Sequence, residues 1–259
     1  MQSGACMVVI AIVNQKGGVG KTTTVIEIAH ILAEDGYRVL AIDFDSQANF
    51  TTYLGEDKTS DNNIFRVLNA DIPVEDAIKH VDGYDFICGS KALSKSDKTF
   101  IEYDDVFLLS DVLESVRDKY DFVLIDNGPS RSTLLTMSYV ASDYIVVPCS
   151  CDDGGTDGVE EVYNDLQEMR SARHTISHAR ILGIILTAYE KTNMHADAWD
   201  RIEQLQNNIE EKPFIDKVRK AITVSEAKTA RESLQQYDKY SNPAMDYRRI
   251  VKEIIERTK

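Results

Sequence analysis

The stretch M-V-V-I-A-I-V-N-Q-K-G-G-V-G-K-T-T, residues 7–23, decides the fold. Its first part, Met7–Val13, is continuously apolar, as is typical of a buried parallel strand. The part from Lys16 to Thr23 is rich in glycine, which lets successive backbone N–H groups face a phosphate while a lysine reaches its oxygens. The stretch therefore predicts a strand that leads directly into a phosphate-binding loop.

A helix is predicted directly after this loop. Gly36 is placed to end it, and apolar residues repeat at helical spacing before that glycine, namely Val25, Ile28, Ala29 and Leu32. The phosphates would then lie at the N-terminus of a helix, where unpaired N–H groups and the helix dipole favour anions.

The loop departs from the usual pattern G-x-x-x-x-G-K-[ST] at its first position. Gly20, Lys21 and Thr22 fill the closing positions, but Gln15 stands where the opening glycine would fall. The departure places Lys16 beside the phosphates, so two lysines share one triphosphate, which indicates a nucleotide-switched dimer. The residues expected to bind the nucleotide are Lys16, Gly17, Gly18, Val19, Gly20, Lys21, Thr22 and Thr23.

Length and composition predict one domain over residues 1–259. A chain of 259 residues commonly remains undivided in α/β folds, and no Pro/Gly/Ser linker interrupts it. It has no signal peptide and no apolar run long enough to cross a membrane, so we expect a cytoplasmic, reduced protein. The cysteines, Cys6, Cys88, Cys149 and Cys151, lack zinc-ligand spacing. Inert thiols are favoured over a metal or cluster site at Cys149-Ser-Cys151.

Charge is distributed unevenly along the chain. The net charge is −14, which argues against indiscriminate nucleic-acid binding. Residues 212–259, however, carry +5 and residues 1–211 carry −19. Basic character is therefore confined to one end.

Further apolar, β-rich runs alternate with helix-period stretches. They lie at Val39–Ile42, Phe86–Cys88, Phe122–Ile125, Tyr144–Val147 and Ile181–Leu186. This rhythm predicts an α/β fold, a mostly parallel twisted sheet with helices on both faces and ligands at the carboxyl ends of the strands. Two apolar helical stripes, starting at Val159 and Trp199, are interpreted as core. Residues 56–83 are predicted as short helices and loops.

Three aspartates follow strands at that edge. Asp43 and Asp45 are two residues apart, so in an extended chain they point to the same side and can orient water or bind the shell of a magnesium ion. A solvated acidic turn is the alternative. Val123-Leu124-Ile125-Asp126 is an apolar run that ends in an aspartate. An aspartate at this place usually supports the Mg²⁺ that the hydroxyl of the phosphate loop, here that of Thr22, coordinates.

These motifs resemble those of the ParA family of plasmid and chromosome partitioning ATPases, in the deviant Walker group of P-loop NTPases that also includes the MinD regulators. The resemblance extends from Val8 to Arg257. The matching pieces are N-Q-K-G-G-V-G-K-T-T-T from Asn14, I-D-F-D-S-Q-A-N from Ile42, Y-D-F-V-L-I-D from Tyr120, A-S-D-Y-I-V-V-P from Ala141 and V-S-E-A from Val224.

The resemblance implies a role for each site residue. Lys16 would reach the phosphates of the partner in an ATP-sandwich homodimer, and Lys21 would bind in cis. Thr22 would ligate Mg²⁺, with Asp43 and Asp126 in the magnesium shell, and Asp45 would position the attacking water. ATP is favoured over GTP because no N-K-x-D-like stretch is present.

Two segments depart from the family pattern. Asn127-Gly128-Pro129 stands where relatives often carry two prolines, and Gly128 restores a backbone N–H that can donate to the γ-phosphate. Asp152-Asp153-Gly154-Gly155-Thr156 stands where relatives commonly carry tyrosines, which puts contacts made by that loop in doubt.

The resemblance also implies partners. Relatives bind DNA non-specifically as ATP dimers, and their weak hydrolysis is stimulated by a ParB-like centromere-binding adaptor. No helix-turn-helix extension precedes the loop, so sequence-specific binding is not expected, and the protein would associate with the nucleoid. The candidate DNA surface consists of Lys217, Arg219, Lys220, Lys228 and Arg231, with a solvated basic face as the alternative.

Three rival functions remain open. A MinD-like membrane regulator would need the apolar stripe of the last helix, but Glu253 and Glu256 break its cationic face, and core docking explains the stripe more simply. No stable membrane association is therefore expected. A positioning ATPase for a protein cargo is the second rival. A reductase or cluster carrier, the third, would need cysteines at the dimer interface.

Overall fold

Eight strands form one sheet in the part of the chain that the structure, a computed structural model, describes, which is residues 7–171 and 175–259. The order across the sheet is β3-β4-β2-β5-β1-β6-β7-β8. The strands are β1 (Val8–Ile12), β2 (Val39–Phe44), β3 (Ile78–Val81), β4 (Tyr84–Ile87), β5 (Phe122–Asn127), β6 (Tyr144–Ser150), β7 (Arg180–Tyr189) and β8 (Phe214–Arg219). All neighbouring pairs are parallel except β3 and β4.

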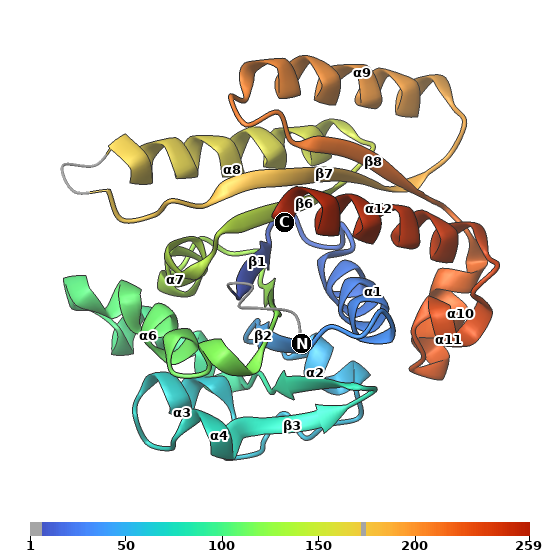
Figure 1. Cartoon of the computed structure of the whole chain (residues 1–259). Coiled ribbons are helices and arrows are strands. Elements are labelled where there is room, and N and C mark those ends of the chain that lie inside the picture. The colour runs from blue at the N-terminus through green and yellow to red at the C-terminus, as the bar shows by residue number, and fades with distance from the viewer. Residues whose placement is uncertain (1–6, 172–174) are drawn as a thin grey trace.

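Helices cover both faces of this sheet, as predicted (Figure 1). One face carries α1 (Lys21–Glu34), α10 (Ile222–Ala230), α11 (Leu234–Asp238) and α12 (Asn242–Thr258). The other carries α3 (Ile64–Leu68), α4 (Val74–Ala77), α6 (Leu108–Glu114), α7 (Thr133–Ala141), α8 (Asp153–Ser171) and α9 (Asn193–Asn208). Short helices α2 (Asn49–Tyr53) and α5 (Ser96–Thr99) follow β2 and β4.

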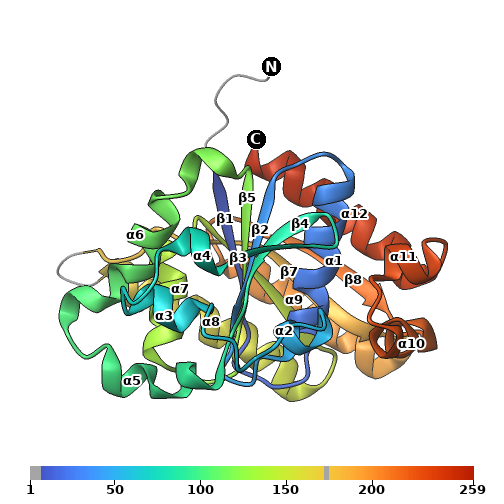
Figure 2. The same cartoon turned by 90° about the horizontal axis from the view of Figure 1, so that it is seen from below.

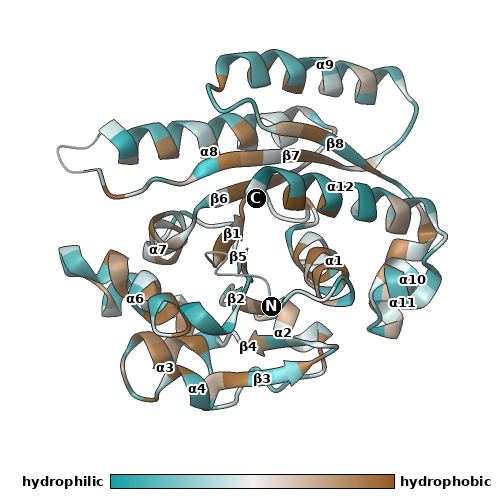
Figure 3. Cartoon of the chain, viewed as in Figure 1, coloured by the Kyte–Doolittle hydropathy of each residue, from teal (hydrophilic) through white to brown (hydrophobic). Residues whose placement is uncertain are grey.

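The central strands β1, β2, β5, β6 and β7 are largely apolar because both of their faces are buried (Figure 3). In β1, Val9 and Ala11 belong to the core beneath α6–α9, whereas Ile10 and Ile12 belong to the core beneath α1 and α12. The stripes that start at Val159 and Trp199 both pack into the first core, as predicted.

The last helix, α12, docks on the protein core. Tyr247, Ile250, Val251 and Ile254 are between 0% and 2% exposed, and α12 packs against α1 and β8. Its apolar stripe is therefore used inside the chain, which confirms core docking. A search of the described residues finds no helix that is both long and apolar enough to span a membrane.

Two strands were missed by the sequence patterns. Residues 56–83 contain β3, so the prediction of only helices and loops there was wrong. Asp82 and Gly83 both have positive φ, 48° and 85°, as in a two-residue hairpin turn that pairs β3 with β4. β8, with sequence F-I-D-K-V-R, lies at the opposite edge of the sheet, where a polar strand is tolerated.

The carboxyl ends of the parallel strands meet at one end of the molecule. Figure 2 shows α2, α5 and α10 at this end and the C-terminus at the other. Asp43 and Asp126 fall within the last residues of β2 and β5 rather than after them. The register pairs these two aspartates side by side, directly next to the loop that follows β1.

Candidate nucleotide site

The glycine-rich loop joins β1 to α1 as predicted. Gly18 and Gly20 have φ of 78° and 89°, the left-handed region in which a side chain is strained. α1 begins at Lys21, and within the described chain no side chain caps it. Its first N–H groups are therefore available to an anion.

Lys21 is held inside the loop. Its Nζ donates to the carbonyl oxygens of Asn14 at 2.8 Å and Lys16 at 3.0 Å, and the residue is 8% exposed. Burial lowers the pKa of Lys21, and the nearby carboxylates of Asp126 and Asp45 oppose that shift. The ammonium thus lies preorganised among the N–H groups of the loop.

Thr22 and Asp126 form the second part of the site. The Thr22 hydroxyl donates to Asp126 Oδ2 at 2.7 Å. Asp126 Oδ1 is buried and accepts no hydrogen bond from the described residues. Burial raises the pKa of Asp126, with Asp43 adding to the shift. A buried carboxylate oxygen without a partner, beside a threonine hydroxyl, fits a hard divalent cation with oxygen ligands.

That cation could not rest on protein carboxylates alone. Over residues 7–171 and 175–259, no group of three His, Cys, Asp or Glu side chains is arranged to hold a metal. The remaining ligands would have to be phosphate oxygens and water, as is usual for Mg²⁺ beside a nucleotide.

Asp43 is fully buried and already bonded on both oxygens. Oδ2 accepts from the backbone N–H and the hydroxyl of Thr51 at 2.8 and 2.7 Å, and Oδ1 accepts from the N–H of Asp45 at 3.2 Å. Burial raises the pKa of Asp43 to about 6, although the Thr51 bonds oppose the shift. Asp43 therefore orients the segment that carries Asp45.

Asp45 stands at the open side of the site. It is half-buried, and its Oδ1 accepts from the N–H of Gln47 at 3.0 Å. Gly128 approaches it so closely that a Cβ there would lie 3.1 Å from Asp45 Oδ1. Gly128, at which the sequence departs from the family pattern, thus packs directly against the Asp45 side chain.

Lys21, Thr22 and Asp45 line a cavity of about 550 Å³, a size usual for small-molecule sites. One end of the cavity is the phosphate loop, and the wall beyond Thr23 is formed by Ile26, Glu27 and Tyr53. Residues of α10 close the other side.

Lys16 does not line this cavity in the free chain. Its Nζ forms an ion pair with Asp152, which also accepts from Ser150 Oγ and Gly155 N at 2.9 Å. The Lys16 hydrogen bond, followed by that of Ser150, lowers the pKa of Asp152. The segment 152–156, in which the family pattern is lost, therefore provides the partner of Lys16. Sequence reasoning missed this pairing, although β6 is the neighbour of β1.

The five basic residues proposed for DNA make different contacts within the chain. Lys217 lies over the rings of Tyr189 and Trp199, with Nζ 4.3 and 4.8 Å from their centroids. Lys220 pairs with Glu190 at 3.0 Å on the surface. Lys228 and Arg231 line the cavity of the phosphate loop instead.

Arg219 is a structural residue. Its Nε and Nη2 donate to the two oxygens of Asp246 at 2.9 and 2.8 Å, and Arg249 donates to the same carboxylate at 3.0 Å. Asp246 is 1% exposed. This cluster fixes α12 to β8, so the guanidinium of Arg219 is engaged within the chain.

Replacing Asp246 by asparagine should destabilise the fold by about 2 kcal/mol, because two guanidinium groups then lose a buried carboxylate. We expect a fall in Tm of roughly 4–8 °C in thermal unfolding. Glu256→Ala, which removes an exposed pair with Lys252 at 3.8 Å, is the control and should change stability by less than about 0.5 kcal/mol. Equal Tm values for the two variants would contradict the role given to Asp246.

The described cysteines are buried, as predicted. Cys88, Cys149 and Cys151 are free, and burial raises the pKa of each thiol, to about 11, 12 and 11. Thiols of this kind are poor nucleophiles and poor metal ligands. Cys6 lies outside the described residues.

The chain is similar to known proteins over nearly its whole length. Residues 7–178 match the family described as "AAA domain". The chain is 31% identical to the "Chromosome-partitioning ATPase Soj" of Thermus thermophilus over 96% of its length and 95% of that protein. It is also 31% identical to the "Chromosome partitioning protein ParA" of Caulobacter vibrioides, over 96% and 94%. The fold superimposes on a Cyanothece McdA–ATP complex with a TM-score of 0.86 at 19% identity, covering 98% of both chains.

Proposed function

The chain belongs to the ParA family of partitioning ATPases, and from this premise we propose that it is a Mg²⁺-dependent ATPase whose ATP-bound sandwich dimer binds DNA non-specifically. Its cargo would be a plasmid or a chromosome, and residues 1–259 would act as one ATPase domain. A ParB-like adaptor would stimulate weak intrinsic hydrolysis. The protein would lie in the cytoplasm on the nucleoid.

One observation carries this proposal, namely that Asp126 Oδ1, beside Thr22 at the start of α1, has no hydrogen-bond partner among the residues that the structure describes. It leaves one carboxylate oxygen available to a cation beside the place where the β- and γ-phosphates would lie if the loop N–H groups and Lys21 bind them. Bound Mg²⁺ would neutralise charge on the transferred phosphoryl group.

The other site residues bind the phosphates, neutralise their charge and orient the attacking water. Residues 17–23 bind the phosphates, and Lys21 neutralises charge in cis. Asp45, positioned by Asp43, orients the water that attacks the γ-phosphorus; the bond to the leaving ADP oxygen breaks, and inorganic phosphate is released. Lys16 of each subunit, once released from Asp152, reaches the phosphates bound to the partner.

The DNA part of the proposal is tested by binding of the protein to random-sequence DNA with ATP, with ADP and without nucleotide, across a salt series. We expect binding only with ATP, and an affinity that falls steeply with salt because phosphate contacts release counterions. Equal binding in all three states, or none in any, would contradict it.

Lys220 is the best single residue for that test. Its pair with Glu190 is exposed, so Lys220→Ala should not disturb the fold, and a phosphate can replace Glu190 as its partner. Arg219→Ala would instead break the cluster at Asp246 and confuse DNA binding with stability.

Gly128→Ala should lower kcat by about tenfold, because the added methyl would lie 3.1 Å from Asp45 Oδ1 and displace the carboxylate. Binding of ADP should be unchanged. Stopped-flow hydrolysis separates binding from chemistry. Unchanged turnover in Gly128→Ala, or in Gly128→Pro, would contradict the role of this glycine.

A further inference from the structure

Arg131 joins three elements around the phosphate loop. It lies after Asp126, in the segment that leads from β5 to Ser132, the residue that caps α7. Its Nε donates to Gln15 Oε1 at 3.1 Å, and its Nη2 donates to Asp165 Oδ1 of α8 at 2.6 Å. Gln15 Nε2 donates to Asp165 Oδ2 at 2.9 Å, so the three side chains close a ring of hydrogen bonds.

The centre of this ring is a buried carboxylate. The Asp165 side chain is 11% exposed, whereas that of Arg131 is 64% exposed. Tyr139 Oη of α7 also reaches Asp165 Oδ2, at 3.5 Å. Burial raises the pKa of Asp165, and the charge of Arg131 opposes that shift. A buried carboxylate with one cationic partner depends on that partner.

The ring ends on residues adjacent to the reacting groups. Gln15 directly precedes Lys16, and its place in the loop is the one where the opening glycine of the common pattern would stand. At the other end, the segment that carries Arg131 contains Gly128, which packs against Asp45. Arg131 therefore links the first residues of the phosphate loop, through Gln15, to the segment after β5 that packs against Asp45.

α8 and the turn before it hold both residues that precede the loop glycines. Asp165 accepts a hydrogen bond from Gln15, and Asp152, just before α8, forms an ion pair with Lys16. Movement of α8 relative to the β5–α7 segment would consequently shift Lys16. Arg131 opposes such movement because its planar guanidinium, with several N–H donors in fixed geometry, serves Gln15 and Asp165 at once.

We propose that Arg131 is a positioning residue for hydrolysis, which fixes the segment after Asp126 to Gln15 and α8 and so sets the placement of Lys16 and Gly128. This inference rests on the proposed function, since it presumes that the site hydrolyses ATP with Lys16 in trans. Arg131 does not line the cavity, so its effect is transmitted through Gln15 and Gly128.

The test compares Arg131→Met and Arg131→Lys with the unaltered chain. Because the loop N–H groups and Lys21 remain, the affinity for ADP should stay within about twofold of the unaltered chain. The kcat for ATP should fall on the order of 10- to 100-fold in Arg131→Met, because misplacement of reacting groups by about 1 Å has effects of this size. Arg131→Lys should recover part of the loss.

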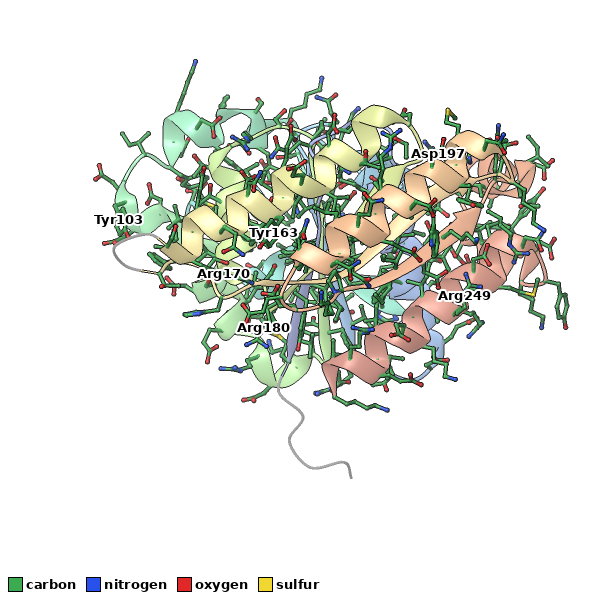
Figure 4. The ribbon with its side chains drawn as sticks, turned by 90° about the horizontal axis from the view of Figure 1, so that it is seen from above. Tyr103, Tyr163, Arg170, Arg180, Asp197 and Arg249 are labelled. Carbon is green, nitrogen blue, oxygen red and sulfur yellow. The ribbon has the colours of Figure 1, made fainter. Side chains whose placement is uncertain are left out.

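Arg170→Met is the matched control. Arg170 is also an arginine in contact with α8, in this case as part of it (Figure 4), and it pairs with the poorly exposed Glu211 at 2.6 Å. Its removal should lower the Tm about as much as Arg131→Met does, and it should leave kcat and KM unchanged.

The outcomes separate the two levels of the proposal. Wild-type kcat in Arg131→Met, or equal losses of kcat in Arg131→Met and Arg170→Met, would overturn the role of Arg131 and leave the proposed function standing. An unaltered protein that neither binds nor hydrolyses ATP would overturn the proposed function itself. A loss of kcat confined to Arg131 variants, with ADP binding retained, supports the inference.

Discussion

Asp45→Ala should lower kcat for ATP hydrolysis by about 10²- to 10⁴-fold while leaving ATP binding intact, because removing a group that orients the attacking water has effects of this size. In the structure, the Asp45 carboxylate accepts one hydrogen bond, from the N–H of Gln47. Within the described residues it makes no hydrogen bond to the phosphate loop. The variant should therefore accumulate as an ATP-bound dimer, which size-exclusion chromatography with ATP would show.

Asp57→Ala is the matched control for this variant. Asp57 is an exposed aspartate whose carboxylate also accepts from an N–H two residues later, that of Thr59 at 2.8 Å, and it does not line the cavity. It should hydrolyse ATP at the wild-type rate. Wild-type turnover in Asp45→Ala would remove this residue from the mechanism.

Lys16→Ala should reduce turnover by about 10³-fold or more, the size expected when a cation supplied in trans is lost from a phosphoryl-transfer site. ATP-dependent dimerisation should weaken as well, because the partner's phosphates lose an ionic contact. Binding of ADP to the single chain should change little, since Lys16 is paired with Asp152 there and Lys21 holds the loop.

The pair with Asp152 is weak enough to be exchanged. Its two side chains are 34% and 53% exposed, and exposed pairs contribute about 0–1 kcal/mol. Lys119→Ala, which removes a similarly exposed pair with Glu75, is the control and should leave kcat and dimerisation unchanged. Full activity in Lys16→Ala would contradict a role for this lysine in trans.

The core of the site could be predicted from the sequence because it depends on short segments and strand order. The loop and α1 are contiguous, and a parallel sheet places the ends of β1, β2 and β5 side by side, which brings Thr22, Asp43 and Asp126 together. Asp43 was assigned to the magnesium shell, but its bonds to Thr51, eight residues later, could not be foreseen.

The parts that could not be predicted depend on long-range docking. Arg219 meets Asp246 only because α12 packs along β8, and Lys16 meets Asp152 across 136 residues of sequence. Lys228 and Arg231 face the cavity because α10 turns back over the loop after β8, whereas a basic stretch in the sequence indicates only charge. The β3 strand was missed because four residues of mixed polarity carry too little periodicity.

The central claim is that Lys16 acts on the nucleotide of the partner subunit, and the most direct measurement is ATP turnover in an equal mixture of Lys16→Ala and Asp45→Ala chains. Each variant alone should be nearly inactive. In a mixed dimer, the site that keeps Asp45 receives Lys16 from the other subunit, so roughly a quarter of the wild-type sites should regain activity if subunits pair at random. A mixture no more active than the two variants measured separately would show that Lys16 does not act across a dimer, and would contradict the account.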